Sequence, residues 1–285
     1  MSSSSTPRPL APPPPTGDAR LDALATLLAI VDRLRAPDGC PWDREQTVES
    51  MAPSLVEEAH EAVEAIDRKA DGPTVEELGD LLMVIALVGK IGEQEKRFDL
   101  GAVARAVSEK LVRRHPHVFG EVRVDSSAQV LSNWEKIKAA ERASKAEDAS
   151  ALAGVPVALP ALQRASRLSA KAIAAGFKWS DAGGALAKVR EEVHELEQAF
   201  AERERAPERL QAELGDVLLA TAFLGQYVGL DPEKATRDAL RRFEERFRDM
   251  ERRLDGQLRS STLAQMMAAW EEAKIATARS SSGAR

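Results

Sequence analysis

The sequence predicts an all-α protein built from two tandem helical-bundle domains. Apolar residues recur at spacings of three and four along most of the chain, and no segment alternates as a half-buried strand would. Aromatic residues make up only 4% of the 285 residues, whereas charged residues make up 30%, which favours helices over sheets. Acidic, basic and aromatic landmarks also recur in the same order about 135 residues later, a period that indicates a duplicated domain.

The first half of the chain contains five predicted helices. The first begins near residue 19, carries an apolar stripe, and ends at Pro37 and Gly39. Cys40–Pro41–Trp42 is expected in a loop. Thr74 with Glu77 resembles a capping box, so a helix is expected to begin at Thr74. The stripe residues are Leu21, Leu24, Leu27, Leu28, Val31 and Leu34, and the later helices are expected at about 48–69, 74–96, 99–114 and 127–144.

The second half repeats this order after a linker over residues 145–159, which contains Gly154 and Pro156. Helices are expected at about 160–175, 184–204, 207–229, 232–254 and 262–278. We therefore predict an N-terminal domain over 19–144 and a C-terminal domain over 160–279. The Ser- and Pro-rich residues 1–18 and the residues 280–285 are expected to be disordered tails.

Charge and composition limit the classes of function. A net charge of −6 argues against direct binding of nucleic acids through phosphate neutralisation. A single cysteine excludes an intramolecular disulfide and is consistent with a cytoplasmic protein. The longest apolar run, from Leu81 to Gly89, is about half of the roughly 20 residues that a membrane span needs, so no membrane association is expected. Residues 1–17 also lack the apolar segment of a signal peptide.

The most informative feature is an acidic pattern that occurs twice. An EExxE sequence on one predicted helix is followed by ExxD on the next, as in Glu77 and Asp80. From Leu81 onward the second helix is apolar all round, which predicts burial from several sides. Because a buried carboxylate without a partner is costly, and no cation lies within four residues of Glu77 or Asp80, a metal ion is expected. The acids are Glu57, Glu58, Glu61, Glu77 and Asp80 in the first copy and Glu191, Glu192, Glu195, Glu213 and Asp216 in the second.

Two other interpretations of the acids remain open. One is a solvated acidic face that pairs with lysines elsewhere. The other is a di-iron carboxylate bundle, because Glu57 with His60 and Glu191 with His194 have the Glu-x-x-His spacing. The di-iron interpretation leaves many of the acids without a role and requires both halves to share one bundle. Otherwise both histidines are surface residues of helices.

Basic and aromatic residues follow each acidic unit. Arginine and lysine at these positions suit phosphate contacts, although a helix C-terminus also favours cations. Each Trp-x-x-x-Lys pair could stack on a base and reach a phosphate, although a lone Trp is more often a core residue. The residues are Lys110, Arg113, Arg114, Trp134 and Lys138 in the first copy and Arg241, Arg242, Arg246, Trp270 and Lys274 in the second.

These motifs resemble the MazG family of all-α nucleoside triphosphate pyrophosphohydrolases. The resemblance extends over nearly all of residues 19–278. It includes Gly39–Cys–Pro–Trp42–Asp, both acidic units, Arg113–Arg–His–Pro–His–Val–Phe119 and the repeated Trp-x-x-x-Lys. It implies hydrolysis of nucleoside triphosphates to monophosphate and pyrophosphate with Mg²⁺, or Mn²⁺ in its place, in the upkeep of nucleotide pools. It also implies a homodimer whose subunits complete each other's bundles.

The resemblance implies roles for individual residues as well. Glu191, Glu192, Glu195 and Asp216, with Glu213 beside them, would hold the metal, and Glu192 could take a proton from water. Glu191, Glu192 and Arg246 are the expected catalytic residues. Lys188, Arg242, Arg246, Trp270 and Lys274 would bind the substrate, as would Lys110, Arg114, Trp134 and Lys138 in the first copy.

In related two-domain proteins the C-terminal copy is regarded as the main catalytic unit, and we expect the same here. This copy departs from the family pattern, since Arg242 replaces the more typical Lys and Ala212 replaces an acid. The first copy keeps all five acids. A non-catalytic nucleotide sensor, or a bundle that binds a partner protein, is the alternative from a different class.

Overall fold

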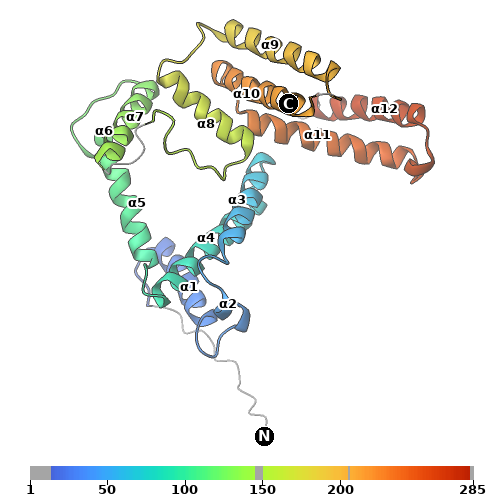
Figure 1. Ribbon diagram of the computed structural model, residues 1–285. Helices are drawn as coiled ribbons and strands as arrows, with labels where there is room; N and C mark the ends of the chain where they lie inside the picture. The colour runs from blue at the N-terminus through green and yellow to red at the C-terminus, as the bar shows by residue number, and fades with distance from the viewer. Residues whose placement is uncertain (1–13, 145–149, 205, 283–285) are drawn as a thin grey trace. The chain divides into compact units, whose positions relative to one another are not determined.

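The computed structural model describes residues 14–144, 150–204 and 206–282, and these residues form helices without any strand (Figure 1). The all-α prediction is thereby confirmed. The chain divides into two compact units, Met1–Ala139 and Ala140–Arg285, called here the N-terminal and C-terminal units. The predicted domain limits stay predictions. Parts of the predicted tails and linker, namely residues 1–13, 145–149 and 283–285, lie outside the described residues.

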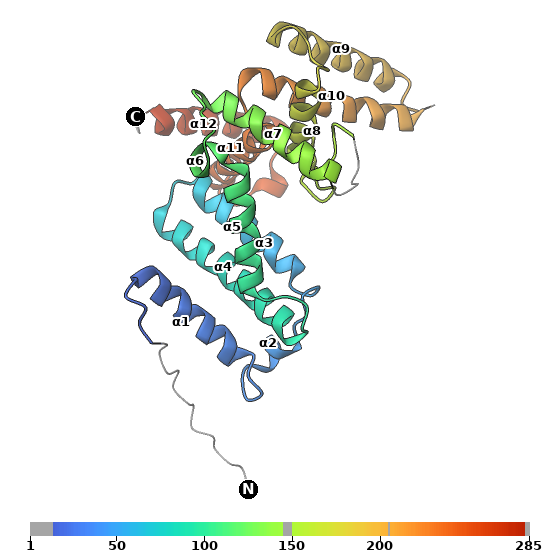
Figure 2. The same cartoon turned by 90° about the vertical axis from the view of Figure 1, so that its left-hand side faces the viewer.

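In the N-terminal unit, helix α4 is the central element, and α1, α3 and α5 each pack against it (Figure 2). Helix α2 lies where the sequence predicted only a loop. It begins at Pro41, whose fixed φ and missing N–H suit the first helical position. The helices of this part are α1 (Ala19–Leu34), α2 (Pro41–Glu45), α3 (Ala52–Asp67), α4 (Asp71–Gln94), α5 (Leu100–Arg114), α6 (Pro116–Phe119) and α7 (Ser127–Ser144).

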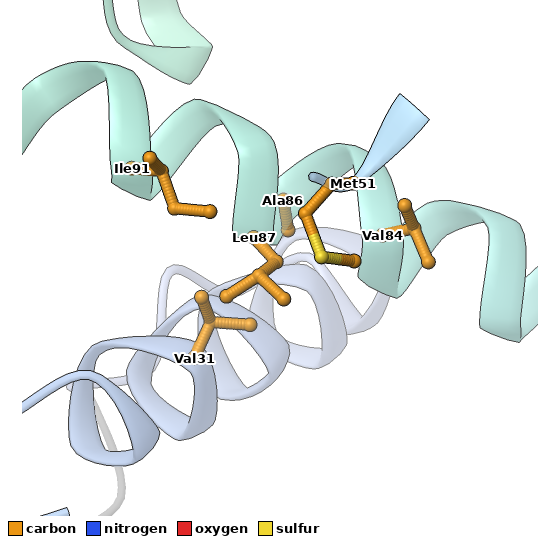
Figure 3. Packing of buried hydrophobic residues seen from close by; sticks show 6 residues of the cluster. All are labelled: Val31, Met51, Val84, Ala86, Leu87 and Ile91. Carbon is orange, nitrogen blue, oxygen red and sulfur yellow. The ribbon is translucent and has the colours of Figure 1, made fainter. Parts of the chain in front are cut away.

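The core of the N-terminal unit forms where one face of α4 meets α1 and the residue before α3. Figure 3 shows Val31 of α1 directed toward Leu87 of α4, with Met51 beside them. Leu87 and Ile91 are 1% and 0% exposed. Leu27 and Leu28, two members of the predicted stripe, pack against this core. The same stripe is open to solvent at its start, because Leu21 and Leu24 are exposed.

The predicted start of α4 is wrong, and its predicted burial from several sides holds for only part of the helix. The helix begins at Asp71 rather than Thr74, with Ala70 as its N-cap and no side-chain cap bond. The early start is possible because Pro73 lies in the first turn, where no helical N–H bond is lost. The segment after Leu81 is also not buried all round, since Leu82 and Ile85 are exposed. Within the described residues, the neighbours of α4 cover only part of its circumference.

The C-terminal unit repeats this arrangement around α10, which packs against α9, α8 and α11, while α12 packs along α11. Asp181 and Asp231 cap α9 and α11 through side-chain oxygens. Helix α10 ends at Gly229, whose φ of 67° suits glycine. The elements are α8 (Ala161–Ala174), α9 (Ala182–Ala201), α10 (Pro207–Val228), α11 (Pro232–Arg253), a 3₁₀ helix (Leu258–Ser260) and α12 (Leu263–Ser282), which reaches into the predicted tail 280–285.

In the C-terminal unit, Trp179, which precedes α9, packs against aromatic residues of α10. The Tyr227 hydroxyl accepts a hydrogen bond from the Trp179 backbone N–H at 2.7 Å, and Phe223 contacts Trp179 edge-on at 5.5 Å. Trp179 is therefore a packing residue, whereas Trp42 of the first copy is 58% exposed. None of the helices among the described residues is long and apolar enough to cross a membrane.

The central position of α4 predicts a large cost for truncating its buried face. Leu87→Ala should lower the free energy of unfolding by about 2–5 kcal/mol, because it removes buried methyl groups and leaves a cavity. Leu82→Ala on the same helix, where the side chain is 42% exposed, should cost about 1 kcal/mol or less. Chemical denaturation of both variants measures the difference, and equal losses would contradict α4 as the centre of the core.

Candidate metal and nucleotide site

In the C-terminal unit, three carboxylates from two helices converge. Glu192 and Glu195 lie one turn apart on α9, and Glu213 lies on α10, which packs along α9. One oxygen from each of the three lies within 4.8 Å of the others. Glu192 is 7% exposed, so its carboxyl group lies in a largely buried place. We call Glu192, Glu195 and Glu213 the C-terminal cluster.

Two cations contact the C-terminal cluster. The Lys188 Nζ donates to Glu191 at 2.7 Å and lies 2.8 Å from Glu192. These hydrogen bonds, first to Glu191 and then to Glu192, raise the pKa of Lys188 and keep it charged. The Arg209 Nε lies 3.6 Å from Glu213. Arg209 was not among the predicted site residues, although its position four residues before Glu213 was a usable signal.

In the N-terminal unit, Glu58 of α3 meets Glu77 and Asp80 of α4, again with oxygens within 4.8 Å of one another. We call these three the N-terminal cluster. Partial desolvation, followed by the charges of Asp80, Glu61 and Glu57, raises the pKa of Glu58. Desolvation and then Glu61, by charge and by hydrogen bond, raise the pKa of Glu77. In the described part of the chain, no ion pair reaches the N-terminal cluster.

The two clusters do not use the same positions of the repeat. Asp80 joins the N-terminal cluster, whereas its counterpart Asp216 is exposed and outside the C-terminal cluster. Glu195 joins the C-terminal cluster, whereas its counterpart Glu61 lies outside the N-terminal cluster but acts on both Glu77 and Glu58. Glu57 and Glu191 are exposed and lie outside both clusters. Of the ten predicted metal ligands, the structure therefore brings six together in two groups.

The predicted phosphate-binding residues lie on other helices. Lys110 and Arg114 are on α5, and Arg242 and Arg246 are on α11. Among the described residues, no ion pair joins Lys110, Arg242 or Arg246 to a carboxylate cluster. The Arg246 Nε is buried and has no hydrogen-bond partner within that part of the chain, so this guanidinium has donor capacity for an anion.

The two tryptophans of the Trp-x-x-x-Lys pairs are packed against protein groups. The Trp134 Nε1 donates to the Arg114 carbonyl at 2.8 Å, and its ring contacts His115 edge-on at 5.2 Å. The Lys138 Nζ lies over the same ring at 5.1 Å. Trp270 packs on Phe243 at 5.5 Å, and Lys274 donates to Glu271 at 2.9 Å. The core interpretation of both tryptophans therefore has direct support.

The histidines lie outside the two carboxylate clusters, although the His194 Nδ1 is 3.6 Å from Glu197. His60 and His194 are exposed, and neither belongs to the carboxylate groups of the described residues. The His194 ring instead contacts the Gln198 amide at 2.9 Å. The local arrangement thus lacks the Glu-x-x-His ligands of the di-iron interpretation.

The donor chemistry of both clusters fits a hard divalent cation. Mg²⁺ and Mn²⁺ take oxygen ligands and usually keep waters or substrate phosphates in their remaining positions. Three carboxylates from two helices leave such positions open. The residues that could hold an ion are Glu192, Glu195 and Glu213 in one unit and Glu58, Glu77 and Asp80 in the other.

Comparisons with known proteins agree with this chemistry. A family model described as the MazG nucleotide pyrophosphohydrolase domain matches residues 46–119 and 184–250. The nucleoside triphosphate pyrophosphohydrolase of Escherichia coli (strain K12) is 40% identical over 233 residues, which are 81% of this chain and 88% of that protein. The nucleoside triphosphate pyrophosphohydrolase/pyrophosphatase MazG of Thermotoga maritima is 39% identical over 251 residues, 87% of this chain and 94% of that protein.

A crystal structure of a mazG-related protein from Thermotoga maritima matches 39% of this chain and 96% of its own, at 28% identity and a TM-score of 0.35. Both segments matched by the family model contain a whole carboxylate cluster, and the second also contains Lys188 and Arg209.

The repulsion within the N-terminal cluster predicts a pH effect on the metal-free protein. Because the folded state raises the pKa of Glu58, its favourable contribution is present below the unfolded value of 4.5 and is lost as the pH rises through the folded pKa. The melting temperature of Glu58→Gln, relative to that of the wild type, should therefore rise as the pH increases from about 4 to about 7 in the presence of a chelator. Glu109→Gln, which removes an exposed carboxylate of α5, is the control. A Glu58→Gln gain that is the same at both pH values would contradict the mechanism.

Proposed function

The chain belongs to the MazG nucleotide pyrophosphohydrolase family, and from this premise we propose that it hydrolyses nucleoside triphosphates to the monophosphate and pyrophosphate. The observation that carries the proposal is the C-terminal cluster, in which a buried glutamate, two further acids and a lysine converge. Acids of this kind suit a divalent cation, and the lysine suits a phosphate. The role in upkeep of nucleotide pools belongs to the same proposal.

The cofactor we propose is Mg²⁺, with Mn²⁺ as a substitute. When bound, the ion neutralises charge on the phosphates and lowers the pKa of water. Glu192 would accept the proton of the attacking water. Glu195 and Glu213 complete the ligand set. Glu191 and Asp216, outside the cluster in this structure, are secondary candidates.

Cations of the C-terminal unit bind the triphosphate in this proposal. Lys188 is already within hydrogen-bond distance of the cluster and is held in the charged state. Arg209 lies beside Glu213. Arg246 contributes a buried Nε with donor capacity, and Arg242 lies one turn before it on α11. Arginine suits this work because its planar fork binds two phosphate oxygens at once.

The N-terminal unit is assigned an accessory role. Its acids are assembled, but the Trp134 N–H is already bonded to a backbone carbonyl and its ring face is covered by Lys138. That arrangement supports a structural role for Trp134 rather than stacking on a base. Lys110 and Arg114 remain candidates for phosphate contact in this unit.

A homodimer is the proposed assembly. A groove of about 420 Å³ on the α9–α10 face is lined by five apolar side chains, including Val193, Phe200 and Leu214, and by Glu197. These three residues are 40%, 56% and 51% exposed. Leu218, one turn after Leu214 on α10, is 49% exposed. A contiguous apolar face of this kind marks an interaction site, and a second copy of the chain is its proposed occupant.

Activity should depend on one cluster more than on the other. Glu192→Gln should lower the rate of pyrophosphate release from a mixed nucleoside triphosphate pool with Mg²⁺ by at least about 100-fold, because the proton acceptor and a ligand are lost. Glu58→Gln should retain most of the activity. Glu197→Gln on α9 and Glu64→Gln on α3 are controls for exposed acids of the same helices. Loss only in Glu58→Gln would reverse the assignment, and no release from the wild type would favour the nucleotide-sensor alternative.

The proposed dimer should depend on the apolar face of α9 and α10. Phe200→Asp should convert the dimer to a single chain, because a charge would be buried in an apolar interface. Size-exclusion chromatography with light scattering gives the mass. Val157→Asp, which changes a residue that is 80% exposed, is the control. A single-chain mass for the wild type, or a dimer that survives Phe200→Asp, would contradict the proposed interface.

A further inference from the structure

The residues one helical turn before Glu192 and Glu213 differ from those before their counterparts Glu58 and Glu77. Lys188 precedes Glu192 by four positions on α9, and Arg209 precedes Glu213 by four positions on α10. In the N-terminal unit the same positions, four before Glu58 and four before Glu77, hold Ser54 and Pro73. Residues four apart lie on the same face of a helix. The C-terminal cluster therefore has two cations built into its own helices, and the N-terminal cluster has none at these positions.

Each of these cations contacts one acid inside the C-terminal cluster and one outside it. Lys188 is 2.8 Å from Glu192, a member of the cluster, and 2.7 Å from Glu191, which is outside. Arg209 is 3.6 Å from Glu213 and 2.8 Å from Glu202, which is also outside. Both cations can therefore leave the cluster and still keep a carboxylate partner.

The contacts within the C-terminal cluster are also of a kind that is readily released. In both pairs the cation comes first along the helix and the acid follows, which is the weaker of the two orientations because it opposes the helix dipole. The Lys188 and Arg209 side chains are 33% and 40% exposed, so solvent or a ligand reaches them. A triphosphate offers these cations several negative oxygens at once.

The positive charges of Lys188 and Arg209 at the cluster oppose the binding of a metal cation there. While Lys188 and Arg209 lie against Glu192 and Glu213, a divalent cation meets like charge as well as its ligands. Moving the two cations to a triphosphate removes this opposition and frees the carboxylate oxygens. Metal and triphosphate then each raise the affinity of the other by the same factor.

We propose that Lys188 and Arg209 are internal counter-ions that lower the affinity of the C-terminal cluster for a divalent cation until both bind a triphosphate instead. The N-terminal cluster, by contrast, binds a divalent cation without substrate. The inference rests on the proposed function, since it assigns the triphosphate as the ligand that moves the two cations. Its consequence is that the C-terminal unit assembles its metal site only together with substrate, while the N-terminal unit is filled beforehand.

The test measures binding of Mn²⁺ alone to the full chain, from the electron paramagnetic resonance signal of free Mn²⁺. The N-terminal cluster is first neutralised by Glu58→Gln, Glu77→Gln and Asp80→Asn, so that only the C-terminal cluster reports. In this background Lys188→Met should tighten Mn²⁺ binding by about fivefold to tenfold, since one positive charge is removed at short range. Lys188→Arg should keep the weak binding, and Lys178→Met, an exposed lysine of the same unit, should change nothing.

The converse test builds the counter-ion into the N-terminal unit. With the C-terminal cluster neutralised by Glu192→Gln, Glu195→Gln and Glu213→Gln, the N-terminal cluster should bind Mn²⁺ more tightly than the C-terminal cluster does in the first background. Ser54→Lys should weaken that binding by about fivefold or more, and Ser54→Met should not. This variant changes a half-buried position in the first turn of α3, and Ser54→Met controls for the larger side chain there.

A triphosphate analogue with a methylene group between the α- and β-phosphorus atoms measures the coupling, because its α–β bridge resists hydrolysis. After correction for Mn²⁺ held by the free analogue, the analogue should tighten Mn²⁺ binding to the C-terminal cluster by about fivefold or more, and by less in Lys188→Met.

Equal Mn²⁺ affinity with and without Lys188, or no weakening by Ser54→Lys, would overturn the counter-ion role. Absence of Mn²⁺ binding in every C-terminal variant would overturn it too. If the variants show the expected order of Mn²⁺ affinities but the wild type releases no pyrophosphate, the enzymatic proposal is rejected and the counter-ion role stands. If pyrophosphate is released but the expected order of affinities is absent, the counter-ion role is rejected and the enzymatic proposal stands.

Discussion

Repulsion between carboxylates on two packed helices is the constraint on which the candidate sites depend. Packing of α3 on α4, and of α9 on α10, brings three acids in each unit within 4.8 Å of one another. Apolar contacts elsewhere on the same helices hold these groups together, as Leu87 and Ile91 do in the N-terminal unit. The hydrophobic core therefore keeps acidic groups close together, where a bound cation or protonation relieves their repulsion.

The two units answer this constraint in different ways. In the C-terminal unit Lys188 and Arg209 contact the acids, and Glu192 is buried. In the N-terminal unit the acids are more exposed and their repulsion is expressed as raised pKa values of Glu58 and Glu77. Both copies have thus kept the acids, but among the described residues only the C-terminal cluster has cations in contact with it, which supports unequal roles for the two units.

The same helices present apolar side chains on faces that the rest of the described chain leaves open. Leu78 and Leu82 of α4, like Leu214 and Leu218 of α10, are about half exposed. Each central helix is therefore buried on one face, charged near its start and apolar on another face. This division links the metal site to the proposed assembly, because a subunit docked on the open face would lie against the helices that carry the acids.

The sequence determined the helical class, the duplication and the acids, because helical periodicity and residue spacing are local properties. It located Glu58, Glu77, Glu192 and Glu213 as candidates without any knowledge of packing. Only the tertiary structure decided which acids meet: Asp80 joins one cluster, Asp216 stays outside the other, and Arg209 pairs with Glu213. It also showed that α4 begins at Asp71 and is exposed at Leu82. These outcomes depend on how two helices are rotated against each other and on which neighbours cover them, and neither is encoded in the spacing of residues along one helix.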